Sequence, residues 1–137
     1  MNARSPHGLF LIAATGILVF DLLASLLSRL TGIPYAAFSI GSFLIYLAAG
    51  YSAQRRFGFG VAALVGAGTG LAESTVGWGI SWLIGPGRSG MEQPAVTRIF
   101  GTVILVVIIG SVVAMVGAAV ARIRANPVAG EARSPDR

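Results

Sequence analysis

The sequence predicts an all-α integral membrane protein, a bundle of four transmembrane helices. Of its 137 residues, 55% are hydrophobic and only 11% are charged, and the mean hydropathy is +0.80. A soluble domain carries about 25% charged residues and cannot bury this much apolar surface in so small a core. In a bilayer, each span must satisfy its own backbone hydrogen bonds, which favours helices. Four long apolar runs therefore predict four spans, and they leave no room for a second folded domain.

The first span is expected at about residues 9–30 and the second at about 36–53. The first run is longer than the apolar region of about 7–15 residues found in signal peptides, and it holds Asp21. We therefore interpret it as a retained helix. The turn residues Thr31–Pro34 follow it, and Pro34 is a natural helix boundary. The second run is short but, at roughly 1.5 Å per residue, long enough to cross a hydrocarbon core.

The third span is expected at about residues 60–84 and the fourth at about 99–121. Residues 85–94 are rich in Gly and Pro and predict the longest connection, outside the membrane. The transmembrane domain thus covers residues 1–121. Residues 122–137 are polar and predict a disordered cytoplasmic tail.

Arginine supplies all ten basic residues and predicts the orientation of the chain. Cytoplasmic loops of membrane proteins carry an excess of basic residues. Three arginines lie on the side of the first and third connections: Arg29, Arg88 and Arg98. The other seven share a side with both termini: Arg4, Arg55, Arg56, Arg122, Arg124, Arg133 and Arg137. Both termini are therefore expected in the cytoplasm, in a multi-pass protein of the plasma or bacterial inner membrane. We assign the net charge of +5 to contacts with anionic lipid and not to nucleic-acid binding.

Two acids, Asp21 and Glu73, lie near the centres of the first and third runs. An ionisable group at that depth costs about 2.5–3.5 kcal/mol on insertion, so it needs a reason in packing or function. Counting from the span centres places Tyr46 at the same level with Ser111 close by, which predicts one polar layer across the bundle. No arginine is expected at that depth, and burial disfavours a charged carboxyl. We expect at least one acid to be protonated at neutral pH and hydrogen-bonded to Tyr46, Thr69 or a serine.

Small residues recur at helical spacing on the third and fourth spans. Gly66, Gly70 and Gly77 share one face of the third span, and Gly110 and Ala114 are four residues apart on the fourth. Small residues let helix backbones approach each other closely. The pattern therefore predicts that these two spans pack tightly against each other.

The sequence lacks the motifs of several enzyme and cofactor classes. It has no cysteine, its single histidine is His7, and it contains no HExxH, GxSxG or P-loop signature. Thiolate metal sites are therefore excluded, and a transition-metal site is not expected. We predict a protein that is not an enzyme and that binds no metal or cofactor.

Two functional interpretations follow from the acids. In the first, Asp21 and Glu73 act mainly as interhelical hydrogen-bond and packing elements of a non-catalytic assembly or accessory subunit. In the alternative, a proton- or cation-coupled transporter of a small solute uses Asp21 and Glu73. A bundle this small has little interior, so a conduction path would form most easily between subunits. Besides the lipid bilayer, the expected partner is a second copy of the chain or another membrane subunit.

In size, span count and the acid of its first span, the chain resembles the small multidrug resistance transporters. These are four-helix proteins in which a carboxylate of the first helix exchanges protons for cations. The resemblance is one of layout: Asp21 stands in place of a glutamate, and Glu73 has no counterpart in the family pattern. The aromatic pocket that the family places around the first acid is also missing. The resemblance therefore assigns no site residue in this chain.

Overall fold

The computed structural model describes residues 5–86 and 96–125. All regular structure in these ranges is helical, in seven consecutive elements: α1 (Pro6–Thr31), η1 (Tyr35–Phe38), α2 (Ser39–Phe57), α3 (Phe59–Ala72), η2 (Glu73–Gly77), α4 (Trp78–Ile84) and α5 (Val96–Ala125). The elements α3, η2 and α4 follow one another without a break and form one long helix. The chain is therefore all-α in its described part, as the sequence predicts.

The four predicted spans are confirmed as four helices long and apolar enough to cross a membrane: Pro6–Thr31, Tyr35–Phe57, Phe59–Ile84 and Thr97–Ala125. The last helix continues past the predicted end of the fourth span, so that residues 122–125 are helical. Most of the predicted 85–94 connection and the rest of the predicted tail, residues 126–137, lie outside the described residues.

Short sequence features set the helix ends. The Ser5 hydroxyl accepts a hydrogen bond from the Gly8 N–H at 3.0 Å and caps the first turn of α1, which has proline at its first position. Gly32 ends α1 in the left-handed conformation, with φ of 72°. Gly58, with φ of 96°, is the single residue between α2 and α3. Glycine adopts such angles without steric cost, so this sharp reversal of the chain needs no longer loop.

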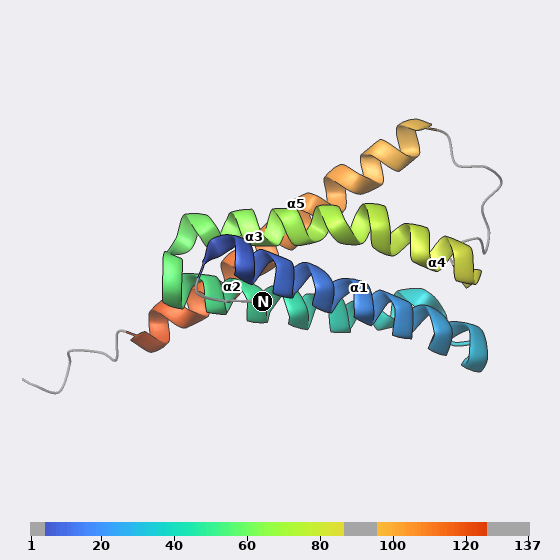
Figure 1. Cartoon of the computed structure of the whole chain (residues 1–137), viewed down its shortest axis with the longest axis horizontal. Coiled ribbons are helices and arrows are strands. Elements are labelled where there is room, and N and C mark those ends of the chain that lie inside the picture. Colours follow the sequence, from blue (N-terminus) through green and yellow to red (C-terminus); the bar gives the residue numbers. More distant parts are fainter. Residues whose placement is uncertain (1–4, 87–95, 126–137) are drawn as a thin grey trace, which may run out of the picture.

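The helices lie in a bundle with one slanted member (Figure 1). Helices α1 and α2 and the continuous α3–α4 helix run along the long axis, while α5 crosses them at an angle. Helix α1 packs on α2, α3, η2 and α4, and α5 packs mainly on α2 and α3. The amino-terminal end of α5 leaves the bundle and diverges from α4 (Figure 1). The bundle is therefore tight at the α2–α3 end and more open beside α4.

Glycines allow α5 to approach both of its neighbours. On the α3 side, a methyl group added at Gly66 would collide with the Gly110 carbonyl oxygen, and one at Gly70 would lie 2.8 Å from the Val106 carbonyl oxygen. On the α2 side, a methyl group at Gly50 would collide with the backbone of Ala114. The contact of α5 with α2 is as extensive as its contact with α3. The sequence pattern points only to the α3 side.

Candidate functional site

Glu73 and Tyr46 join the third span to the second. The Tyr46 hydroxyl donates a hydrogen bond to Glu73 Oε2. Tyr46 is only 1% exposed, and its ring lies over Gly110 of α5, where an added methyl group would come within 2.7 Å of the ring. Gly110 therefore leaves the space that lets the tyrosine ring reach across the bundle. The structure thus brings together Tyr46 and Glu73, two of the residues expected in the midplane layer.

Asp21 has a different partner from the ones that counting along the spans suggests. Its side chain is fully buried, and its Oδ1 accepts a hydrogen bond from the Tyr35 hydroxyl at 2.8 Å. Tyr35 belongs to the short helix η1 and lies just before the predicted second span. The Asp21 and Glu73 carboxyls lie close enough to interact electrostatically. The site is therefore two neighbouring tyrosine–carboxyl pairs.

A π-helical turn, η2, forms the part of the third span that carries this site. In this turn, the Trp78 N–H donates to the Glu73 carbonyl, five residues earlier, in place of the usual four. Glu73 begins the turn, and Gly77 at its end lies directly against Asp21 Oδ2, where any added methyl group would collide. Gly77, predicted as a packing residue, thus makes room for the Asp21 carboxyl. Single π-helical turns inside α-helices occur often at functional sites.

Several oxygens near Asp21 have no hydrogen-bond partner among the described residues. They include Asp21 Oδ2, Ser25 Oγ and Ser81 Oγ, and the three side chains are at most 1% exposed. Ser25 follows Asp21 by one turn of α1, and Ser81 follows Gly77 by one turn of the third span. Buried polar atoms are normally hydrogen-bonded in proteins. This interface therefore holds unused hydrogen-bonding capacity.

A cavity of about 200 Å³ lies on the open side of Glu73. We call it the Glu73 cavity. It lies between η1, the η2–α4 segment and the amino-terminal half of α5, and its lining includes Tyr35, Glu73, Trp78, Arg98, Thr102 and Val106. Glu73 is thus bonded inside the bundle by Tyr46 and is also accessible from this cavity. Counting along the spans predicts no arginine near the acids, whereas the structure places Arg98 in the same cavity as Glu73.

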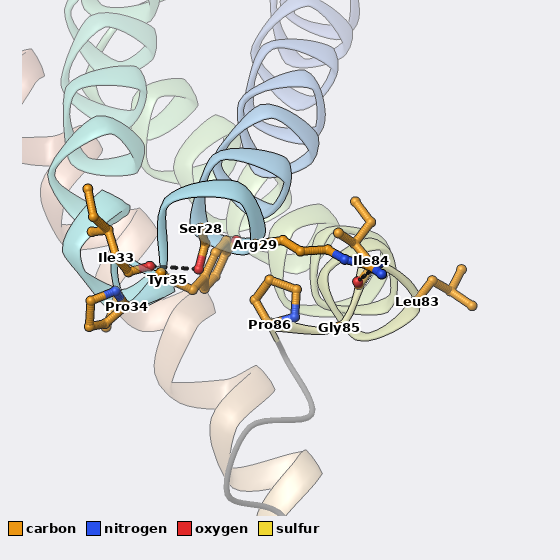
Figure 2. Close-up of a pocket in the computed structure, with 11 residues that line it drawn as sticks. Ser28, Arg29, Ile33, Pro34, Tyr35, Leu83, Ile84, Gly85 and Pro86 are labelled. Carbon is orange, nitrogen blue, oxygen red and sulfur yellow. Dashed lines mark hydrogen bonds between the residues drawn. The ribbon is translucent and has the colours of Figure 1, made fainter.

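A second and larger cavity, of about 870 Å³, lies at the α1–η1 end of the bundle. Figure 2 shows Arg29 reaching from α1 to the end of α4, where its Nη1 donates to the Ile84 carbonyl at 2.7 Å. Ser28 Oγ donates to the Ile33 carbonyl at 2.8 Å and holds the turn after α1 (Figure 2). Tyr35 lines this end cavity as well as the Glu73 cavity. It is therefore the side chain shared by both cavities and by the buried Asp21.

The remaining polar residues proposed for the layer lie elsewhere. Ser111 Oγ donates to the Ala63 carbonyl at 3.2 Å, so its hydrogen bond joins α5 to α3 and not to either acid. Thr69 is fully buried, but its hydroxyl has no partner among the described residues. Across the described residues, no group of three or more His, Asp and Glu side chains is placed to hold a metal ion. The chemistry of the site thus rests on the two carboxyls and their tyrosines.

Comparison with protein-family models, curated protein sequences and solved structures finds no match to this chain. The functional argument therefore rests on the two tyrosine–carboxyl pairs and on the cavities beside them. The most informative geometry is at Glu73, which contacts Tyr46 on one side and the cavity on the other.

Proposed function

We propose that this protein binds a small solute in the Glu73 cavity and couples that binding to proton exchange at Glu73 and Asp21, as a proton- or cation-coupled transporter does. The observation that carries the proposal is that the Glu73 carboxyl faces both the interior of the bundle and a cavity. Its carboxyl accepts the Tyr46 hydrogen bond and also lines a cavity of about 200 Å³. A carboxyl serving only to hold helices together needs no such access. Ionisable residues inside membrane spans commonly mark ion pathways and proton relays.

The second carboxyl supports the same proposal. Two carboxyls that interact cannot both become charged without repulsion, so a proton or cation at one changes the affinity of the other. The Tyr35 hydroxyl donates a hydrogen bond to Asp21, and Tyr35 also lines both cavities. A change in the charge of Asp21 would therefore alter a hydrogen bond made by the wall of the Glu73 cavity. Besides Glu73 and Tyr35, Arg98 is the ionisable group that lines the Glu73 cavity. The acids, the tyrosines and Arg98 are thus the groups through which solute and proton would influence each other.

The competing proposal is the structural one. Tyr46–Glu73 joins α2 to the third span, and Tyr35–Asp21 joins η1 to α1. Both bonds would stabilise an accessory or assembly subunit that transports nothing. The two proposals differ in whether Glu73 must lose and regain a proton.

Glu73→Gln should fold normally and lose solute-linked proton exchange. Glutamine has nearly the same size, and its amide oxygen still accepts the Tyr46 hydrogen bond, but it cannot titrate. The measurement is proton release or uptake in weakly buffered nanodiscs near neutral pH when small amines, amino acids or carboxylic acids are added. Thermal melting of the same samples reports folding. Glu92→Gln, in the connection outside the predicted spans, is the matched control and should behave as wild type.

The result contradicting coupling is equally clear. If no added solute changes proton binding in the wild type while Glu73→Gln melts normally, Glu73 is a hydrogen-bond acceptor only, and the structural proposal is favoured. If instead Glu73→Gln fails to fold, a charged carboxyl is needed for stability. That outcome opposes the coupling proposal, which requires the protein to stay folded when Glu73 is neutral.

We further propose that the four helices lie in the plasma or inner membrane with both termini in the cytoplasm. Support comes from the apolar character of the four spans and from the arginine distribution, seven on the side of the termini against three on the other. Reporter fusions after Arg56 and after Ala125 should read as cytoplasmic, and a fusion after Pro86 as external. Opposite readings at two of the three positions would reverse the proposed orientation.

A further inference from the structure

Opposite charges face one cavity from two different helices. Glu73 comes from the third span and Arg98 from the first turn of α5, and both line the Glu73 cavity. Within the part of the chain that the structure describes, no ion pair joins them, and the Arg98 guanidinium has no hydrogen-bond partner, although the Arg98 carbonyl accepts from the Thr102 hydroxyl. An acid and a base that face one cavity without contacting each other can each bind one end of the same ligand.

The register of α5 sets the spacing between the two charges. Val106 lies against Gly70 of α3, which marks a common level on the two helices. At 1.5 Å per residue, the Cα of Arg98 lies about 12 Å beyond that level, and the Cα of Glu73 about 4.5 Å beyond it. The charges are therefore attached roughly one to two helical turns apart. Both side chains line the same cavity of about 200 Å³, which suits a short molecule.

The rest of the lining fits a molecule with a charge at each end. Trp78 and Tyr35 place aromatic rings at the Glu73 cavity, and Val106 adds an apolar surface. Aromatic faces attract ammonium groups, and a guanidinium binds carboxylate or phosphate oxygens with paired hydrogen bonds. The volume of about 200 Å³ is below the range of roughly 300–1,000 Å³ typical of drug-sized ligands. The ligand is thus a small one.

We propose that the Glu73 cavity binds a small zwitterion, with its ammonium group at Glu73 and its acidic group at Arg98; this inference rests on the solute binding proposed above. A simple cation would leave Arg98 without a counter-ion, and a simple anion would leave Glu73 without one. A zwitterion satisfies both charged groups and adds no net charge beside Glu73, which lies within a membrane span, where an unpaired charge is costly. Where the Glu73 carboxyl holds a proton, the ammonium group displaces it, so that solute and proton then compete for this carboxyl.

Binding of matched probes tests the inference directly. The full chain is reconstituted in phosphatidylcholine nanodiscs, and calorimetry measures binding of β-alanine, γ-aminobutyrate and δ-aminovalerate, which differ by one methylene each. Butylamine and butyrate are the cation-only and anion-only probes. We expect at least one of the three zwitterions to bind, about tenfold or more tightly than either single-charge probe, because it alone contacts both charged side chains.

Variants identify the side chains involved. Arg98→Gln should weaken zwitterion binding by about tenfold or more and leave butylamine binding unchanged, because only the acidic group loses its partner. Arg122→Gln, at the opposite end of the same helix and also exposed, is the matched control and should bind as wild type. A phosphatidylethanolamine headgroup has the same pair of charges. If adding that lipid to the nanodiscs competes with the soluble zwitterion, the headgroup is a natural source of this chemistry.

Three outcomes would overturn the inference. The first is that none of the three zwitterions binds. The second is that butylamine binds as tightly as every one of the zwitterions. The third is that the zwitterions bind wild type and Arg98→Gln with equal affinity. Failure of the coupling proposal looks different: zwitterions would bind in an Arg98-dependent way but release no proton.

Discussion

Gly50→Leu is expected to prevent stable packing of α5 on α2. Gly50 is buried, and even a methyl group at this position would collide with the backbone of Ala114. Backbone cannot rotate away as a flexible side chain can, so the two helices would have to separate. Overpacking commonly costs about 1–3 kcal/mol, and for this variant we expect about 3 kcal/mol or more because the obstacle is a helix backbone. Thermal melting in detergent measures the loss.

Gly16→Leu is the matched control for this prediction. Gly16 lies in the interior of α1, and nothing lies within 4 Å of a methyl group placed there. Leucine favours helix more than glycine does, so this variant should melt at the wild-type temperature or above it. Equal melting of Gly50→Leu and Gly16→Leu would show that α2 and α5 are not in backbone contact in the folded protein.

The number and extent of the spans could be predicted because a chain inside lipid can adopt few kinds of secondary structure. A run of apolar residues in a bilayer must be helical, and turn residues such as Pro34 and Gly58 mark where each helix ends. Which helices pack together is less determined by sequence. Gly66 and Gly110 stand in repeated small-residue patterns, but Gly50 stands in the second span without such a repeat. Its role depends on the tilt of α5, which local sequence does not encode.

One of the two tyrosine–carboxyl pairs was among the pairings expected from the sequence, and the other was not. Counting from the span centres places Tyr46 level with Glu73, and in the structure the Tyr46 hydroxyl donates a hydrogen bond to the Glu73 carboxyl. The same counting places Tyr35 far from Asp21 because it lies outside the predicted second span. In the structure, Gly41 of α2 packs on Phe20, the neighbour of Asp21, so Tyr35 lies only about two turns further along. Its long side chain spans that distance. The π-helical turn at Glu73 has no proline or other sequence mark that would have predicted it.

Tyr35→Phe is expected to destabilise the protein through Asp21. The substitution removes only the hydroxyl that donates to Asp21 Oδ1 at 2.8 Å. Since Asp21 is fully buried and Oδ2 has no partner among the described residues, both carboxyl oxygens would then be unpaired. A buried polar group left without its partner costs about 1–3 kcal/mol. Tyr51→Phe is the control, since the Tyr51 hydroxyl is at the surface and accepts a long bond of 3.4 Å from the exposed Arg55; its melting temperature should be unchanged.

A double-mutant cycle with Asp21→Leu separates the hydrogen bond from packing of the ring. Leucine removes the buried carboxyl, so the Tyr35 hydroxyl no longer has an acceptor there, and deleting it should cost little in this background. The double variant should therefore melt above Tyr35→Phe alone, although it carries one more substitution. If Tyr35→Phe costs the same in the wild-type and Asp21→Leu backgrounds, the hydroxyl does not serve Asp21. Tyr35 would then be only a wall of the two cavities, and the link from Asp21 to the Glu73 cavity would be lost.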